Sequence, residues 1–573
     1  MSVEETPVLR LGVMCNGTTF PQWQADCLQQ LLAMAKVKVE VSLLIIEDKP
    51  TPSSGQERSL KQFLPFGDKL WTVYNERQVN KRSRALWPTD MSTTFSNVPK
   101  LSCQVLHQQK FDYFKPADLT TIRHYNLDII LQFGFGELDG EILTLPRYGV
   151  WSFCHYDLGK EQAGLVGFWE IYRGEEVTEV ALQRLTPKGG RIVLQKGTFA
   201  TVKFPHVSNL DLVYLESTAW PTYVCRDIAL KQAAYLEGSP LQPLTPHYRR
   251  PNNGQMLFFQ LRIASNRLDN LFTKFFRQEQ WNVGIVNAPI EKFLLPQFQP
   301  EIQWLAKPKR NCFVADPFIV YEGEKPTLLL EAYDYRTRKG WISALENQAD
   351  GSFSKPKTVL ELPIHLSYPY PIKYKGEIYC VPETYQAHEV GLYKASPFPE
   401  KWVKVATLVK DFAAVDTTVF EYEGRWWLLC TKQDGSISQN VRLFAWYASD
   451  LMGPWQPHAA NPIKADVRAS RPGGTPFVSE GQLYRPSQDC SHTYGGAITI
   501  NRVVCLTPDE FKEELAIHLK PDPNSLYPDG LHTLSAAGKF TVVDGKRTIF
   551  VWAAFQEALK EVFQRRFKRN LHL

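Results

Sequence analysis

The sequence lacks three features that would point to common classes of function: a strong charge imbalance, paired metal-binding cysteines and a long apolar run. Its net charge of +5 over 573 residues is small, whereas nucleic-acid binding requires a concentrated basic face. None of the ten cysteines forms a CxxC pair, so the spacing of zinc ribbons is absent. We therefore predict no nucleic-acid partner and no metal site, and the sequence indicates no particular cofactor.

The start of the sequence holds no hydrophobic core of a signal peptide. Residues 1–10 are acidic and polar, and the most apolar early run, residues 41–46, is far too short to cross a bilayer. Several cysteines, Cys430 among them, lie in apolar patterns typical of strands, and buried free thiols fit a reducing compartment. We expect a cytoplasmic protein.

Aromatic residues are abundant, at 13% of the chain with 15 Trp and 24 Tyr. They supply flat surfaces on which sugar rings stack, but β-rich cores also use many aromatics. Both interpretations stay open. The length predicts two to four domains of roughly 100–200 residues each.

Residues 8–220 alternate between strand-like and helix-like segments. Trp23 to Met34 has helical spacing, and short apolar runs predict strands at 8–15, 37–46, 128–134 and 150–154. This alternation predicts a Rossmann-like α/β domain with a parallel or mostly parallel sheet. A helical and proline-rich segment, 221–280, follows: 224–238 has a helical pattern, 239–254 holds four prolines and reads as a linker, and 261–276 is amphipathic.

From residue 281 to 552 the pattern is all-β and repetitive. Apolar hairpins recur at intervals of roughly 50–60 residues, with turns at Gly323, Gly376, Gly424 and Gly481 and a fifth turn at Gly538 or Gly545. Five copies predict a five-bladed β-propeller. After it, 553–573 has the spacing of a basic amphipathic helix, which either contacts an anionic membrane surface or packs on its own protein.

The segment 127–185, which contains LDIILQFGFGELDG, resembles the formyltransferase family, and the resemblance covers most of residues 8–200. That family holds the oxyanion and takes the amine proton with an Asn, a His two residues later and an Asp in a further loop. Here the histidine is kept as His155, but the Asn position is Phe153.

The acidic positions of the family's loop fall on Lys188 and Arg191, and neither cation can serve as a general base at neutral pH. Asp157 is an acid that could stand in. The resemblance implies a domain that keeps the fold and has lost formyl transfer, and that binds another ligand or only supports the propeller. An amino-sugar formyl or acyl transferase is kept as an alternative.

Polar residues mark the ends of the hairpin strands that would meet at one mouth of the propeller channel. Strand starts supply Asp316, His365 or Tyr368, Asp416, Arg471 and His532, and strand ends supply Glu331, Glu383, Arg485, Gln488 and Asp489. We predict that these residues form a funnel that binds substrate. The sequence leaves open whether a cation occupies the channel.

The ADPF motif at Asp316 resembles the five-bladed propellers of glycoside hydrolase family 43, in which the first-blade Asp is the base, a third-blade Glu is the acid and a second-blade Asp tunes it. Here the second blade opens with SYPYPI and lacks that Asp, and the third opens with VDTTVF at Asp416. The resemblance implies Asp316 as base or nucleophile and Glu383 or Asp416 as acid.

A further resemblance is to the N-terminal region of the plant glucosamine inositolphosphorylceramide transferases. It spans about 300–535 and rests on the motifs HLSYP (365–369), PET (382–384), LMGPW (451–455) and RPSQDCSHTYG (485–495). It implies a glycan or glycolipid setting.

Three hypotheses follow. The first is an enzyme that transfers or hydrolyses a glycosyl group in the funnel, with Arg471 and Arg485 holding an anionic group; the others are the formyl or acyl transferase and a non-catalytic glycan-binding scaffold. Structural ion pairs of Glu383 and Asp416 with the two arginines are the plain alternative. If the carboxylates form a site, replacing any of them by its amide should leave stability level or raised, because clustered carboxylates repel.

Overall fold

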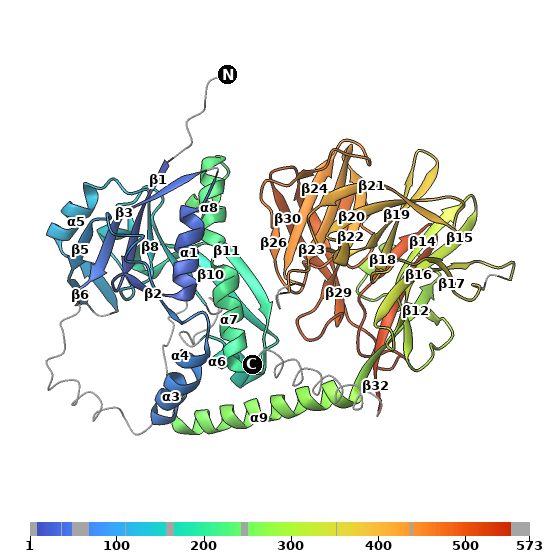
Figure 1. Cartoon of the computed structure of the whole chain (residues 1–573), viewed down its shortest axis with the longest axis horizontal. Helices are drawn as coiled ribbons and strands as arrows, with labels where there is room; N and C mark the ends of the chain where they lie inside the picture. The colour runs from blue at the N-terminus through green and yellow to red at the C-terminus, as the bar shows by residue number, and fades with distance from the viewer. Residues whose placement is uncertain are drawn as a thin grey trace, which may run out of the picture. The chain divides into compact units, whose positions relative to one another are not determined.

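The computed structural model describes residues 8–35, 37–48, 68–108, 110–155, 166–241, 250–350, 352–435 and 439–551 (Figure 1). The chain forms two compact units, Met1–Leu268 and Asp269–Leu573. Asp157 and the predicted helix 553–573 lie outside the described residues. Within the described ranges, no helix combines the length and apolar character needed to cross a membrane. All ten cysteines are free thiols.

The N-terminal unit is built on a seven-stranded sheet with the strand order β11-β10-β9-β8-β1-β3-β5. Strand β10 (Val177–Leu185) is antiparallel to both of its neighbours, β9 and β11 (Arg191–Ala200). The parallel strands are β1 (Val8–Cys15), β3 (Lys38–Glu47), β5 (Lys100–Cys103), β8 (Ile129–Gln132) and β9 (Val150–Cys154). The predicted mostly parallel sheet is confirmed. Strand order reverses between β1 and β8, and α/β sheets bind ligands at the carboxyl ends of strands beside such a reversal.

The helices described in this unit pack their apolar residues inward. Helix α1 buries Trp23, Cys27, Leu28 and Leu31, which confirms the helical spacing of the sequence. A π-helical turn, Asn75–Val79, joins α3 to α4. The helix bounds are α1 (Gln22–Leu32), α3 (Lys69–Tyr74), α4 (Asn80–Arg82), α5 (Pro116–Arg123), α6 (Phe168–Arg173), α7 (His206–Ser217), α8 (Trp220–Ala229) and α9 (Asn253–Phe276). Short strands pair as β2 (Thr19–Pro21) with β4 (Pro88–Asp90) and β6 (Val105–Gln108) with β7 (Phe111–Phe114).

The boundary between the units differs from the expected linker at 239–254. The chain divides within α9, after Leu268, and this helix begins at Asn253, eight residues before the predicted helix at 261. The first half of α9 packs Met256 and Phe259 against α6, which ties it to the N-terminal unit. Residues 242–249, the middle of the expected linker, lie outside the described residues.

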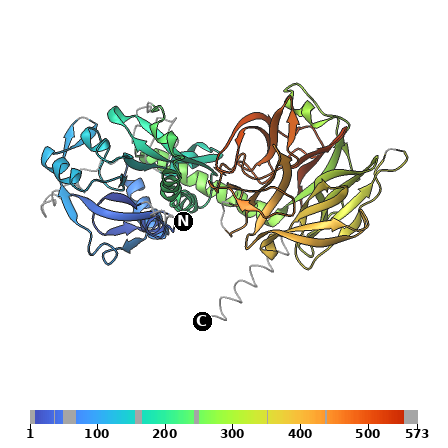
Figure 2. The same cartoon turned by 90° about the horizontal axis from the view of Figure 1, so that it is seen from above.

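The second unit consists of five β-sheets, so the predicted five-bladed propeller is confirmed. In Figure 2 the colours of this unit run around a ring from green through yellow and orange to red. The first two blades are β14 (Cys312–Glu322), β15 (Lys325–Asp334), β16 (Lys339–Glu346) and β17 (Lys357–Leu360), then β18 (Ser367–Tyr374), β19 (Glu377–Glu383), β20 (Glu389–Ala395) and β21 (Trp402–Lys410).

The third blade is β22 (Ala414–Tyr422), β23 (Arg425–Lys432), β24 (Arg442–Ala448) and β25 (Gln456–Pro457), with β26 (Lys464–Ala465) also paired to β24. The fourth is β27 (Phe477–Ser479), β28 (Gln482–Asp489), β29 (Ala497–Leu506) and β30 (Phe511–Leu519). The first four hairpin turns lie at the predicted glycines.

The fifth blade is assembled from both ends of the unit. Its strands are β31 (Leu534–Ala537), β32 (Phe540–Phe550), β12 (Arg277–Val286) and β13 (Gln303–Trp304), in the order β13-β12-β32-β31. The turn between β31 and β32 lies at Gly538, where φ is +59°, and Gly545 is inside a strand. Pairing of β12 with β32 along Arg277↔Phe550 to Val286↔Thr541 closes the ring.

Because β12 closes the ring, the propeller should need it to fold. A fragment covering 269–573 should unfold in one cooperative thermal transition, measured by circular dichroism. A fragment covering 305–573, which lacks β12 and β13, leaves β32 without its partner strand and should give no cooperative transition. A cooperative melt of the shorter fragment would show that four blades and a hairpin suffice.

Candidate functional site

The first strands of the first three blades share an unusual backbone feature. Each has a β-bulge at which a non-glycine residue adopts positive φ: Asp316 at +49°, Tyr368 at +45° and Asp416 at +51°. Such bulges redirect a side chain, and positive φ at non-glycine residues is costly, about 1–3 kcal/mol each, and clusters at functional sites. The repeat of this feature around the channel marks these strand starts as a candidate site.

Asp316 is buried and surrounded by donors. Its Oδ1 accepts a hydrogen bond from Thr533 Oγ1 at 3.1 Å and its Oδ2 accepts one from Tyr368 N at 3.1 Å. His532 lies between two carboxylates: its Nε2 is 3.4 Å from Asp316 Oδ1 and its Nδ1 is 2.5 Å from Asp544 Oδ2. The imidazole therefore bridges the first and fifth blades.

These contacts set the charges of the group. Burial raises the pKa of Asp316 to about 6, although His532 opposes the shift. Burial lowers the pKa of His532, but Asp544 and Asp316 outweigh it and the net shift is upward. Near pH 7 an ionised Asp316 therefore faces a histidine that tends to be protonated.

The raised pKa of Asp316 predicts a pH-dependent stability. The folded state binds a proton on Asp316 more tightly than the unfolded chain does, so the free energy of unfolding should fall as pH rises from about 4 through about 6. Asp316→Asn should remove this part of the slope in melts between pH 4 and pH 6. Asp334→Asn is the control, because hydrogen bonds from Arg336 lower the pKa of Asp334 and its removal should change the slope in the opposite sense. Parallel curves for the wild type and Asp316→Asn would contradict the assignment.

Asp416 forms the second group, around an ion pair. Its Oδ2 accepts hydrogen bonds from Arg471 Nε at 2.5 Å and from Gln488 Nε2 at 2.5 Å. Arg471 also donates to Asn440 Oδ1 at 2.8 Å and to the hydroxyl of Tyr494 at 3.3 Å. The side chains of Arg471 and Asp416 are 8% and 3% exposed, so this pair is shielded from water.

Glu383 and Glu331 supply two further buried carboxyls. Glu383 Oε2 accepts a hydrogen bond from Asp416 N at 3.0 Å, and burial and Asp416 raise its pKa well above the usual range. Burial likewise raises the pKa of Glu331, with Asp316, Glu383 and Asp416 adding to the shift. Carboxyls from three blades thus act on one another, as the sequence predicted for the channel mouth.

His365 faces Glu331. Its Nδ1 accepts a hydrogen bond from Gly340 N at 2.9 Å, so the proton of the neutral ring is on Nε2, which lies 3.7 Å from Glu331 Oε1. Burial lowers the pKa of His365, which favours this neutral form. The funnel therefore holds one histidine that tends to be neutral and one, His532, that tends to be charged.

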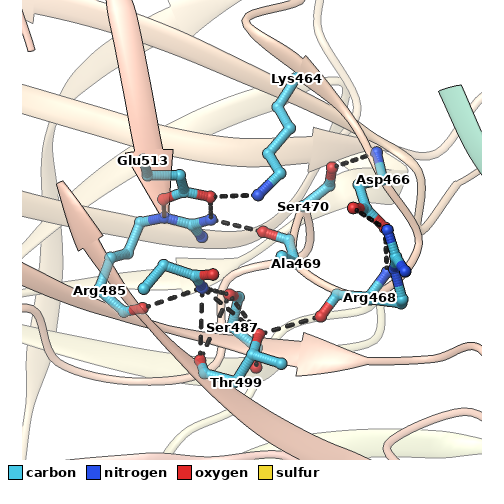
Figure 3. A network of polar contacts seen from close by, with 10 residues as sticks. Lys464, Asp466, Arg468, Ala469, Ser470, Arg485, Ser487, Thr499 and Glu513 are labelled. Atoms are coloured by element: carbon cyan, nitrogen blue, oxygen red, sulfur yellow. Dashed lines mark hydrogen bonds and ion pairs between the residues drawn. The ribbon is translucent and has the colours of Figure 1, made fainter. Parts of the chain in front are cut away.

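Arg485 lies elsewhere, and its expected role is corrected. Figure 3 shows its guanidinium joined to Glu513, with Nε–Oε2 at 2.9 Å and Nη2–Oε1 at 2.7 Å, and Lys464 Nζ at 2.7 Å from Glu513 Oε1. The pair is 2% and 1% exposed. On β28, Arg485 and Gln488 point to opposite faces because strand side chains alternate, and only Gln488 reaches Asp416. Arg485 is therefore a structural cation, and we withdraw it as an anion-binding residue.

Asp489 and Tyr368 also take structural positions. Asp489 shares a face with Arg485, where its Oδ2 is 3.1 Å from His518 Nε2. The Tyr368 hydroxyl is fully buried, lies 2.9 Å from Thr418 Oγ1 and accepts a hydrogen bond from Gly474 N at 2.8 Å. In place of the predicted substrate contacts, Asp489 makes a contact within the fourth blade and Tyr368 makes contacts that hold neighbouring blades together.

Several residues of the funnel were missed by the sequence reasoning. Asp544, fully buried, lies inside β32. A charged residue in the apolar run FTVVDG was a usable signal, but the sequence left open a turn at Gly545, next to Asp544. Trp281 stacks on His532 at 4.0 Å between ring centroids and comes from β12, whose place in the fifth blade gave no local signal. Tyr494 is 36% exposed beside Arg471.

Atoms of Asp316, His532 and Asp544 lie within 4.8 Å of one another, which is close enough to hold a cation. His532 tends to be protonated, however, and a protonated imidazole does not bind a cation.

The N-terminal unit carries a cavity of about 430 Å³ at the carboxyl ends of β8 and β9. His155 lines it, and burial lowers the pKa of this residue to about 3. Trp23, Phe153 and Tyr214 contact its ring. The positive charge of Arg191 is balanced by Glu137, since Arg191 Nη2 is 2.9 Å from each carboxylate oxygen of Glu137. The loss of formyl transfer stays a prediction.

The match to a known protein family lies in the propeller. Residues 305–524 match the sequence family described as glucosamine inositolphosphorylceramide transferase 1, N-terminal. Proteins named glucosamine inositolphosphorylceramide transferase 1 are similar over 205 residues, at 37% identity in Oryza sativa subsp. japonica and 35% in Arabidopsis thaliana. The match covers 35% of this chain and 27% of each relative, so the chain spans about a quarter of their length.

Solved structures of glycoside hydrolases align with part of the chain. A family 117 glycoside hydrolase from Zobellia galactanivorans aligns with a TM-score of 0.29 at 12% identity, covering 48% of this chain and 91% of its own. A family 43 β-xylosidase/α-arabinofuranosidase from a compost metagenome aligns at 0.28 and 11%, covering 35% and 73%. These TM-scores are too low to support the fold by themselves. The assignment of five blades is therefore based on the strand pairing described above.

Proposed function

We propose that the chain is a carbohydrate-active enzyme that transfers or hydrolyses a glycosyl group in the propeller funnel, on a glycan or glycolipid substrate. The observation that carries the proposal is the set of buried carboxyls that three blades bring into electrostatic contact. Burial raises the pKa of Asp316 to about 6, and it raises that of Glu383 well above the usual range. Glycosyl chemistry requires one ionised and one protonated carboxyl, and the raised pKa of Glu383 favours its protonated form.

The roles follow from the charges. Glu383, whose protonated form is favoured by burial and by Asp416, would donate its proton to the leaving-group oxygen. Asp316, mostly ionised, would take a proton from the attacking hydroxyl or act as nucleophile. Asp416 is less suited as the acid, because its carboxylate is already engaged by hydrogen bonds from Arg471 and Gln488. This selects Glu383 from the two acids that the sequence left open.

Arg471 has less freedom to hold an anionic substrate group than the sequence suggested. Its three nitrogens donate to Asp416, Asn440 and Tyr494. We propose that it positions Asp416 and holds the partly exposed Tyr494 at the mouth. The aromatic ring is then the surface that meets a sugar.

A second candidate function is a non-catalytic glycan-binding module. It is favoured by the burial of the acidic groups, since Asp316, Glu383 and Asp416 are only 4%, 5% and 2% exposed. A substrate must reach groups that are almost inaccessible in this conformation.

A panel of nitrophenyl glycosides and nucleotide sugars separates the two. Calorimetry with the panel sugars detects binding, and product formation detects turnover. Turnover that depends on Glu383 supports the enzyme. Binding without turnover, unchanged in Glu383→Gln, supports the module, and the absence of both would overturn the proposal.

A further inference from the structure

A second cavity of the N-terminal unit has a different character from the one at His155. It has a volume of about 840 Å³, is bordered by α3, the π-helical turn, the start of α7 and the first part of α9, and shares no lining residue with the first cavity. Neither the resemblance of this domain to formyltransferases nor the chemistry proposed for the propeller requires this second cavity. π-Helical turns inside helices are frequent at functional sites.

The cavity is strongly cationic. Four arginines line it, Arg77, Arg82, Arg84 and Arg267, against a single carboxylate among the described lining residues, Asp211. That carboxylate is engaged by the turn after α4: it accepts hydrogen bonds from Ser83 Oγ at 2.6 Å, Ala85 N at 3.0 Å and Arg84 N at 3.2 Å. In the described part of the chain, none of the four guanidiniums forms an ion pair.

The two remaining ionisable groups of the wall, Tyr74 and His206, add no charge near pH 7; burial raises the pKa of Tyr74 to about 12. His206 is buried, its Nδ1 is 3.2 Å from the Tyr74 hydroxyl and its Nε2 is 3.0 Å from the Val166 carbonyl. Burial lowers its pKa, so the ring is neutral near pH 7. The positive charge of the cavity is therefore that of the arginines, and it attracts an anion.

The same cavity has an apolar end. Leu70 and Val73 on α3 and Leu257 on α9 are 42%, 47% and 59% exposed, and they line it together with the buried Met256. The two helices start side by side, because Leu70 N donates to Asn253 Oδ1 at 3.1 Å, and Figure 1 shows α3 beginning at the start of α9. Exposed aliphatic side chains of this size next to a charged wall are typical of ligand-binding grooves.

Polarity is graded along both helices. On α9 the lining residues are apolar at positions 256 and 257 and reach Arg267 farther along, where the guanidinium lies 5.9 Å from the Phe204 ring centroid. On the other wall Leu70 and Val73 precede Arg77 and Arg82. Leu70, Val73 and Leu257 thus lie near the starts of the two helices. The arginines lie farther along each segment, with Ile263 one turn before Arg267.

We propose that this cavity binds one molecule of an anionic phospholipid, with the phosphate between the arginines and a hydrocarbon chain against Leu70, Val73 and Leu257. Arginine is suited to phosphate because its planar fork donates two parallel hydrogen bonds. The aliphatic end distinguishes a lipid from free phosphate, which gains nothing from it. This site is independent of the glycosyl chemistry proposed for the propeller.

The test uses the full chain and four probes. Dihexanoyl phosphatidic acid below its micelle concentration carries both head and tails, dihexanoylglycerol carries the tails alone, and inorganic phosphate carries the charge alone. Vesicles of phosphatidylcholine with phosphatidic acid present a membrane surface. Calorimetry should show that the short-chain phosphatidic acid binds at least about tenfold more tightly than either part, as expected when charge-assisted hydrogen bonds and apolar burial act together.

Variants assign the binding to the cavity. The double variant Arg77→Gln/Arg82→Gln and the single variant Leu257→Gln should each weaken binding of phosphatidic acid by about tenfold or more. Matched controls are Arg147→Gln and Leu106→Gln, an exposed arginine and an exposed leucine of the same unit outside the cavity, which should change nothing. Circular dichroism confirms that each variant is folded.

Several outcomes would overturn the proposal. Equal affinity for inorganic phosphate would reduce the site to an anion site, and equal affinity for dihexanoylglycerol would make it an apolar pocket. Binding to vesicles without binding to the monomeric lipid would indicate a membrane surface instead. Unchanged affinity in both cavity variants would place any binding elsewhere.

Discussion

Asp416→Asn is expected to destabilise the propeller by about 3–5 kcal/mol, because it leaves Arg471 without its partner in a buried site. The ion pair is 2.5 Å long and its side chains are 8% and 3% exposed. Chemical denaturation of the 269–573 unit gives the free energy of unfolding directly. This reverses the expectation from the sequence that all three amide variants would keep their stability.

Two controls sharpen this prediction. Arg468→Met breaks a pair with Asp466 whose side chains are 42% and 20% exposed, and should cost less than about 1 kcal/mol. The double variant Asp416→Asn/Arg471→Met removes both charges and should recover much of the loss, since an uncompensated buried charge is what makes the single variant unstable. A level melting temperature in Asp416→Asn would show that the pair is solvated in solution.

Glu383→Gln is expected to behave in the opposite way. Its pKa is already raised well above the usual range by burial and by Asp416, so the amide mimics the protonated acid and stability should be level or higher. Turnover of the glycoside identified by the panel should fall by about 10²–10⁴-fold, the usual contribution of a general acid. Both quantities are measured on the same preparation, as kcat and as the free energy of unfolding.

The matched control is Asp489→Asn. It removes another buried carboxylate of the propeller, but one that contacts His518 instead of the funnel, and it should leave kcat nearly unchanged. A large loss of stability in Glu383→Gln with kcat intact would make Glu383 a scaffold residue and leave Glu331, the other buried glutamate with a raised pKa, as the candidate for the acid.

The hairpins were predictable from the sequence because their signals are local. A glycine turn between two apolar runs fixes a hairpin within about 20 residues of chain, and four of the five turns lie at the glycines that the sequence singled out. The fifth was ambiguous between Gly538 and Gly545, and the structure places it at Gly538. The ring closure was not predictable in this way, because β12 and β32 lie at opposite ends of the unit and nothing nearby in sequence links them.

The sequence predicted which residues belong to the strand ends more reliably than it predicted where their side chains point. Strand ends identified Asp316, Glu331, Glu383 and Asp416, which the structure brings into mutual electrostatic contact. They also gave Arg485 and Asp489, which lie on the opposite face of the same strand from Gln488. A difference of one residue decides which face a strand residue occupies, and a strand end read from sequence is uncertain by more than that.

Closure of the ring by β12 has a consequence for synthesis on the ribosome. β12 is made first and its partner β32 last, so the edge of β12 that pairs with β32 waits without hydrogen-bonding partners while the four intervening blades emerge. At roughly 5–20 residues per second, that interval is on the order of 15–50 seconds. During it, the apolar side chains of Trp281 and Val283, buried in the finished ring, are open to wrong partners. Newly made chains should therefore depend on chaperones until the last blade is complete.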